Sequence, residues 1–180
     1  ALNLCTDQLA VLLLTRERIA SLSYLVHDPH LSRLAGEVDG IATNRGGAEE
    51  ALAARPDLVL ADRGTARDTL ALLRRLNIDI YLHDVPNDVA GIERETRRLA
   101  VALDVTPKAE ALLADMRARL TAIRPALPRP TAAWFFPNAY TSGRGTLSDA
   151  ALTAAGFNNV ATRAGYAGFS GEELIVVRPE

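Results

Sequence analysis

The sequence predicts an α/β fold in which two lobes are joined by a long helix. Short apolar runs alternate with helical patterns in the first half of the chain, which is typical of βαβ units around a mainly parallel sheet. A continuous helical pattern then occupies the middle. An α/β pattern resumes after Pro125, Pro128 and Pro130, which mark a boundary. Together these observations predict one lobe on each side of the helix.

The first lobe is expected to run from residue 1 to residue 86. Apolar runs predict strands at 1–4, 19–23, 40–43, 57–61 and 78–83. Thr6 and Asp7 are expected to cap the first helix, which carries Leu9, Leu12 and Leu13 on one side. The remaining helical patterns predict a turn at 31–34 and helices at 47–54 and 66–76.

A helical linker is expected at residues 87–127. The pattern is helical from 88 to 123 and is broken only around 104–107. Leu113, Met116, Leu120 and Ile123 recur at helical spacing and so share one face. At 1.5 Å per residue, the segment 108–124 would extend about 25 Å, which is long enough to bridge two lobes.

The second lobe is expected at residues 128–180. Its elements are a strand at 131–136, a loop, a helix at 147–155, a loop with a short strand at 159–161, and a helix at 172–177. Two or three strands rarely form an independent sheet, so we expect this lobe to be incomplete. The chain also begins inside an expected strand, and no signal peptide is visible. We therefore expect a trimmed N-terminus.

Composition excludes several classes of protein. The 180 residues are 48% hydrophobic and 23% charged, which is ordinary for a globular protein. The net charge of −2 argues against a nucleic-acid binder. No segment approaches the roughly 20 apolar residues of a membrane span. The single cysteine, Cys5, cannot form an internal disulfide, and its presence does not distinguish a reducing compartment from an exported protein.

Two segments of the chain match each other. "AEEALAARP" places Glu49 seven residues before Pro56, and "GEELIVVRP" places Glu172 seven residues before Pro179. One interpretation is simply two helices with acidic first turns, because the helix dipole favours carboxylates there. The other is a repeated functional device, one on each lobe.

The chain resembles the helical-backbone class (class III) of periplasmic substrate-binding proteins, which serve ABC importers of iron–siderophore complexes, haem and cobalamin. The resemblance covers essentially all 180 residues, and no single string is decisive. The order and spacing of these strings carry it: "NLCTDQLAVLL", "RIASLSYL", "NRGGAEEALAARPDLVLAD", "LLRRLNIDIYLHDVP", "KAEALLADMRARL", "NAYTSGRGTLSDAALTAAGFNNVA" and "GFSGEELIVVRPE".

The resemblance implies two Rossmann-like lobes, a periplasmic location and a solute-binding role without catalysis or cofactor. The ligand would be a metal chelate or a cobalamin-like compound, and the partner would be a permease dimer that alone contacts the membrane. In the family, one surface glutamate on each lobe docks into arginine pockets of the permease. Those glutamates match Glu49 and Glu172. Family members usually continue beyond the position of "RPE", so we expect part of the ligand cleft to be absent.

Ligands of two-lobed binders lie between the lobes, where loops follow the strands. We expect four such loops, at residues 3–7, around 24, at 62–64 and at 138–144, with Phe169 near the last. Tyrosines offer flat faces with a hydroxyl, and arginines offer charge to an anionic chelate. The candidate ligand-binding residues are Tyr24, Arg63, Asn138, Tyr140, Arg144 and Tyr166. Each of them also has an ordinary interpretation as a surface or core residue.

Other reactive residues are interpreted as structural. His27 and His30 have a spacing that can hold a metal, but residues 128–180 contain no histidine, so we expect both to be solvent-exposed. We expect Cys5 to be a small buried residue at a strand end rather than a nucleophile, and His83 to be structural. "TSGRGT" lacks the lysine of a phosphate-binding loop and is expected to be a turn.

Two other functions remain open at this stage. A cytoplasmic doubly wound α/β enzyme or sensor that binds a small ligand or nucleotide would use similar lobes. It predicts a glycine-rich loop after the first strand, where this chain has "NLCTD" without glycine. The second alternative is an interaction domain without a ligand, whose two acidic helices only bind a partner.

Overall fold

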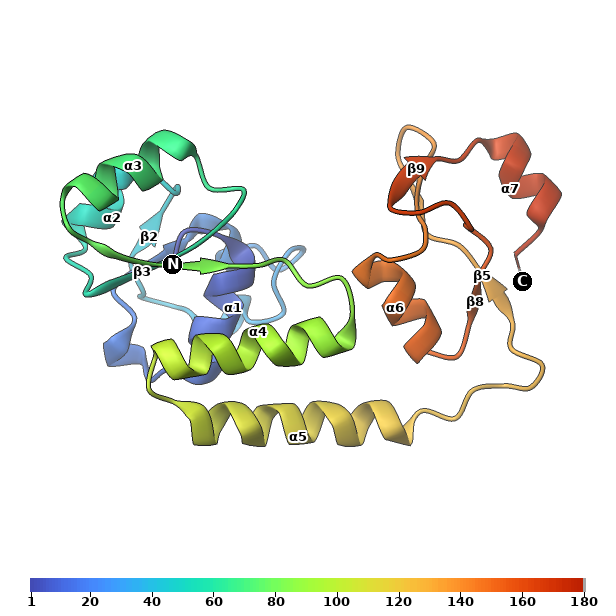
Figure 1. The fold of residues 1–180 in the computed structure, drawn as a ribbon, viewed down its shortest axis with the longest axis horizontal. Helices are drawn as coiled ribbons and strands as arrows, with labels where there is room; N and C mark the ends of the chain where they lie inside the picture. Colours follow the sequence, from blue (N-terminus) through green and yellow to red (C-terminus); the bar gives the residue numbers. More distant parts are fainter. Residues whose placement is uncertain (180) are drawn as a thin grey trace. The chain divides into compact units, whose positions relative to one another are not determined.

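The computed structural model describes residues 1–179 and has a mixed α/β architecture (Figure 1). The chain divides into two compact units. Unit 1 comprises Ala1–Val85 and Glu95–Ala109, and unit 2 comprises Pro86–Arg94 and the chain from Glu110 onward. Within residues 1–179, no helix is long and apolar enough to span a membrane.

Unit 1 contains two pairs of parallel strands. β1 (Leu22–Ser23) pairs with β2 (Thr43–Asn44), and β3 (Leu58–Asp62) pairs with β4 (Asp79–His83) over their whole length. Parallel pairing confirms the βαβ pattern. The strands predicted at 19–23 and 40–43 are shorter than expected: β1 occupies the end of the first range, and β2 overlaps the second only at Thr43 and extends to Asn44.

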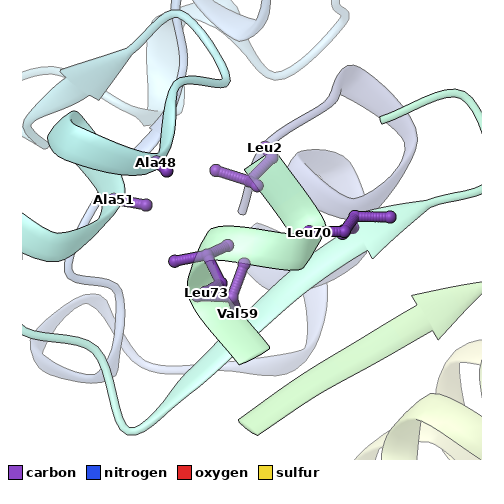
Figure 2. Packing of buried hydrophobic residues seen from close by; sticks show 7 residues of the cluster. Leu2, Ala48, Ala51, Val59, Leu70 and Leu73 are labelled. Carbon is purple, nitrogen blue, oxygen red and sulfur yellow. The ribbon is translucent and has the colours of Figure 1, made fainter. Parts of the chain in front are cut away.

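Helices of unit 1 cover these strands. They are α1 (Leu4–Leu13), α2 (Ala48–Ala53) and α3 (Arg67–Arg75), with short 3₁₀ turns η1 (Arg16–Arg18), η2 (Tyr24–His27) and η3 (Ala35–Glu37). Figure 2 shows a core cluster gathered between α2, α3 and β3. Its buried members are Leu2, Ala48, Ala51, Val59, Ala61, Leu70 and Leu73. The predicted helices 47–54 and 66–76 and strands 57–61 and 78–83 are therefore confirmed.

The strand predicted at residues 1–4 is wrong. Asn3 is the N-cap of α1, because its Oδ1 accepts a hydrogen bond from Thr6 N at 3.0 Å, and the helix begins at Leu4. Thr6 and Asp7 consequently lie buried inside the helix rather than capping it. Leu2 still lies beside β3, since its N–H donates to the carbonyl of Leu60.

Two helices follow β4. α4 (Val89–Ala102) and α5 (Thr106–Ala122) are separated by a short break in which Asp104 adopts a left-handed backbone with φ +55°. The predicted helical stretch and the position of its break are confirmed. The boundary between the compact units passes through both helices. The division into residues 1–86, 87–127 and 128–180 remains our proposal.

Unit 2 contains two small sheets and two further helices. β5 (Thr131–Ala132) pairs in parallel with β8 (Asn158–Asn159), whereas β6 (Phe135–Phe136), β7 (Tyr140–Ser142) and β9 (Tyr166–Gly168) form an antiparallel sheet. The helices are α6 (Leu147–Ala154) and α7 (Gly171–Val177). Both helices were predicted.

The strand prediction for unit 2 needs three corrections. The strand expected at 131–136 divides into β5 and β6, and the strand expected at 159–161 lies at 158–159. The two expected loops contain β7 and β9, so the "TS" of "TSGRGT" belongs to a strand rather than a turn. Asn138 and Ala139 both have positive φ and close a tight hairpin between β6 and β7, which creates the pairing that the sequence did not suggest.

Candidate functional site

Tyr24 is an exposed candidate in unit 1. It begins η2 directly after β1 and keeps 55% of its surface accessible. It shares a pocket of about 450 Å³ with Thr43, Asn44, Arg45 and Glu50. The pocket therefore joins the predicted ligand residue to the helix that carries the glutamate pair.

Arg63 lies at the carboxyl ends of β3 and β4, but it does not line the pocket of Tyr24. Its Nε lies 2.6 Å from Asp84 Oδ1 in an exposed ion pair. The hydrogen bond from Arg63 holds the pKa of Asp84 below its usual value. The guanidinium keeps further N–H donors beyond this bond, so Arg63 can still meet an anionic group.

A buried carboxylate, that of Asp7, holds the residue that precedes Tyr24. Asp7 is fully buried in α1, its Oδ1 accepts from Ser23 N at 3.0 Å, and its Oδ2 accepts from the Ser23 hydroxyl. Ser23 is the residue that precedes η2. Burial raises the pKa of Asp7, and the hydrogen bonds from Ser23 offset part of this effect. Sequence reasoning placed Asp7 at a helix cap and missed this supporting role.

A second buried cluster lies at the end of β4. His83 is 3% exposed, and its Nδ1 lies 3.6 Å from Glu95 Oε2. The Glu95 carboxylate also accepts from Asp84 N at 3.1 Å and from Arg98 Nη2 at 2.7 Å. Burial lowers the pKa of His83, because the charged imidazolium is poorly solvated there. His83 is thus a buried residue that lies against Glu95 at the end of β4, which agrees with the structural role expected from the sequence.

Aromatic candidates of unit 2 share one face of the antiparallel sheet. Directly opposite strand residues point to the same face, and Tyr140 lies opposite Phe136 while Tyr166 lies opposite Ser142. Tyr140 and Tyr166 are 51% and 67% exposed. Trp134 stacks on Phe136 with the ring centroids 6.2 Å apart. We call Trp134, Phe136, Tyr140 and Tyr166 the aromatic face.

Asn138 and Arg144 have local roles that sequence reasoning did not foresee. Asn138 sits at the tip of the β6–β7 hairpin with φ +65°, a conformation that asparagine tolerates well. Arg144 follows β7, and its Nε donates to the carbonyl of Thr162 at 2.8 Å. Both residues remain exposed at the margin of the same sheet. Their ligand contacts remain predictions, as do those of the tyrosines and Arg63.

The two glutamate pairs have the same local geometry. Glu49 and Glu172 are the second residues of α2 and α7, and both are exposed. In each helix the following glutamate folds back: Glu50 accepts from Arg45 N at 2.6 Å, and Glu173 accepts from Ser170 N at 2.8 Å. Across residues 1–179, the side chains of Glu49 and Glu172 have neither a hydrogen bond nor an ion pair.

Three other sequence candidates can be located. Cys5 is exposed in the first turn of α1, so the expected buried residue at a strand end is wrong. His30 is exposed as expected, but His27 is half-buried and its Nε2 is inaccessible, so the expected exposure is wrong for His27. Within the described part of the chain, no group of three or more potential ligands could hold a metal ion.

The chain belongs to the periplasmic binding protein family. The sequence profile of that family matches residues 6–179, which confirms the resemblance seen in the sequence. A protein of Halobacterium salinarum named as a cobalamin-binding protein is 28% identical over 152 residues. That alignment covers 79% of this chain and 41% of the relative, so the chain spans less than half the relative's length.

Solved structures show the same fold. A periplasmic haem-binding protein from Pseudomonas aeruginosa superposes with a TM-score of 0.75 at 24% identity, covering 97% of this chain and 66% of that one. The vitamin B12-binding protein BtuF of Vibrio cholerae gives a TM-score of 0.61 at 20% identity, with 96% and 70% covered. These matches confirm the predicted α/β fold class of two lobes with a helical backbone. The names of these proteins describe binding and no reaction.

Proposed function

We propose that this protein is the solute-binding component of an ABC importer. It would work in the periplasm, bind an iron chelate such as a siderophore complex or haem, or a cobalamin-like compound, and deliver it to the permease. It would carry out no catalysis and need no cofactor. Membership of the periplasmic binding protein family supports this role, as do relatives named for cobalamin and haem.

The observation that carries the ligand class is the aromatic face. Trp134, Tyr140 and Tyr166 remain 42%, 51% and 67% exposed and lie together on one face of a small sheet, where an exposed aromatic patch can receive a ligand. Flat aromatic rings favour flat, weakly hydrated ligands, and the hydroxyls of tyrosine add directed polar contacts. Arg144 at the margin adds positive charge for an anionic group. A planar or ring-shaped chelate matches this combination.

Face-specific variants test the ligand proposal. We expect Tyr140→Ala and Tyr166→Ala each to weaken binding of the recognised compound by about tenfold, because a buried aromatic contact contributes about 1 to 3 kcal/mol. Phe135→Leu is the matched control, since Phe135 is 48% exposed on the opposite face, where it meets Phe169. Equal losses for the control and the tyrosine variants in a titration with hemin and cyanocobalamin would contradict the proposal.

Docking to the permease is assigned to Glu49 and Glu172. In each helix the neighbouring glutamate is engaged locally, so the first carboxylate of each pair can accept an external arginine. Because Glu49 belongs to unit 1 and Glu172 to unit 2, a permease dimer could bind one glutamate on each lobe. Charge pairs of this kind mainly set orientation and association rate.

Charge reversal tests the docking role. We expect Glu49→Arg and Glu172→Arg to abolish transport while leaving ligand affinity unchanged. Glu37→Arg is a control, because Glu37 is another exposed glutamate of unit 1. Transport at the unmodified rate by the double variant Glu49→Arg/Glu172→Arg would contradict docking through these residues. Loss of ligand affinity in that variant would instead indicate a disrupted fold.

A further inference from the structure

Arg163 joins two parts of unit 2 that have separate proposed functions. It lies in the loop between β8 and β9. Its Nη1 donates to the carbonyl of Gly168, the last residue of β9, at 2.6 Å. Its Nη2 lies 2.6 Å from Glu173 Oε1, in the first turn of α7. One guanidinium therefore connects the strand that carries Tyr166 with the helix that carries Glu172.

The backbone around Arg163 is held closely. Arg144 N donates to the carbonyl of Arg163 at 2.9 Å, and Gly143 N donates to the carbonyl of Gly165 at 2.9 Å. A Cβ on Gly143 would lie only 1.9 Å from that Arg163 oxygen, so only glycine permits this approach. The backbone of Arg163 is thus held against the residues that directly follow β7, so its side chain reaches α7 from an anchored loop.

Glu173 is the receiving group on α7. Its carboxylate accepts from Ser170 N, while the Ser170 hydroxyl accepts from Glu173 N at 3.1 Å, which completes a capping box. The hydrogen bond from Ser170 lowers the pKa of Glu173, and the charge of Arg163 contributes in the same direction. The carboxylate is therefore ionised when it meets Arg163. This arrangement fixes the first turn of α7, which also contains Glu172, the residue before Glu173.

We propose that Arg163 is a positioning residue that orients α7 relative to β9, so that Glu172 is presented to the permease in one defined direction. This inference rests on the proposed docking role of Glu172. Unit 1 differs, because the side chain of the corresponding Glu50 accepts from the backbone N–H of Arg45, just before its own helix, and within residues 1–179 it has no ion pair with an arginine.

A double-mutant cycle tests the proposal. The protein is titrated against its permease dimer in nanodiscs, and dissociation constants are measured for Arg163→Met, Glu172→Gln, Glu49→Gln and their pairs. We expect Arg163→Met alone to weaken binding about fivefold, the scale of one favourable surface ion pair. If Arg163 acts through Glu172, its loss has no further effect in Glu172→Gln but adds fully to Glu49→Gln.

Hydrogen exchange provides a readout without the partner. In Arg163→Met, amides of the first turn of α7 should exchange at least several times faster, whereas Arg163→Lys should restore part of the protection. Arg119→Met is the control, because Arg119 lies in the same unit and pairs with Asp115 within α5 at 2.8 Å. Unchanged exchange in α7, or an Arg163 effect that adds to Glu172→Gln, would overturn the positioning role. If neither glutamate variant weakens binding, the docking proposal itself fails, and the positioning role fails with it.

Discussion

Asp7 provides a sharp test of how unit 1 supports Tyr24. The carboxylate is fully buried in α1 and accepts two hydrogen bonds from Ser23, one from the backbone N–H at 3.0 Å and one from the hydroxyl. Ser23 is itself buried and immediately precedes Tyr24. Removing the acceptor should therefore affect both stability and the position of η2.

The magnitude follows from the groups that lose a partner. Asp7→Ala leaves the buried N–H of Ser23 without an acceptor, and a buried unsatisfied donor destabilises by about 1 to 3 kcal/mol. Asp7→Asn can keep both contacts, since the amide oxygen accepts from the N–H and the amide nitrogen donates to the hydroxyl. We expect its free energy of unfolding at neutral pH to equal or exceed that of the unmodified protein.

The pH dependence has a definite sign. Burial raises the pKa of Asp7 in the folded state above its ordinary value of about 3.8. A raised pKa contributes stability that is present below the unfolded value and is lost as pH rises through the folded value. The stability of Asp7→Asn relative to the unmodified protein should therefore increase as the pH rises above about 3.8, because only the unmodified protein loses stability in that direction.

Urea unfolding followed by circular dichroism, at a series of pH values, measures these differences. At pH 7, the free energy of unfolding of Asp7→Asn should equal or exceed that of the unmodified protein, and that of Asp7→Ala should be the lowest of the three. Ligand affinity should fall in Asp7→Ala, if Tyr24 contacts the ligand, and remain in Asp7→Asn. An alanine variant as stable as the unmodified protein at pH 7 would refute the reasoning, as would an asparagine variant that loses its advantage with rising pH.

Three further predictions concern packing and titration. Leu73→Ala should lower the unfolding free energy by about 2 to 5 kcal/mol in urea titration, because Leu73 is fully buried in the unit 1 core. Gly143→Ala should destabilise by about 1 to 3 kcal/mol, because its Cβ meets the Arg163 carbonyl at 1.9 Å, whereas Gly171→Ala meets nothing within 4 Å and should stay within about 1 kcal/mol. Burial lowers the pKa of His83 below its unfolded value of about 6.5. The free energy of unfolding should therefore decrease as the pH falls below about 6.5, and His83→Gln should remove this part of the pH dependence.

Local patterns predicted most of unit 1 and the helices. The apolar run of β3, the amphipathic α3 and the break near Asp104 each depend on neighbouring residues, so the sequence identifies them directly. The strand prediction at residues 1–4 was wrong because the side chain of Asn3 caps a helix there, which outweighs the apolar character of the first residues. β7 and β9 were not predicted because short strands depend on pairing with residues distant in the chain, as Tyr140 pairs with Gly168.

Candidate site residues were found by type and by resemblance, but their environments were not. Nothing in the sequence shows that Tyr140 and Tyr166 share a face, since that follows from the register of the antiparallel sheet. The bond from Arg144 to Thr162 and the bridge made by Arg163 likewise depend on loops folded over one another. The paired glutamates were visible in the sequence as a repeat. The sequence did not show that the second glutamate of each pair accepts a hydrogen bond from a nearby backbone N–H.

The measurement that tests the central claim most directly is intrinsic fluorescence of the protein, titrated with ferric siderophores, hemin and cyanocobalamin. Trp134 is the one tryptophan in the chain and lies on the aromatic face, so it should report binding there. N-acetyltryptophanamide, titrated in parallel, corrects for light absorbed by the compounds. We expect saturable quenching by one compound with a dissociation constant in the micromolar range or tighter. An unchanged, corrected signal across the whole panel would contradict the proposed role in importing such compounds.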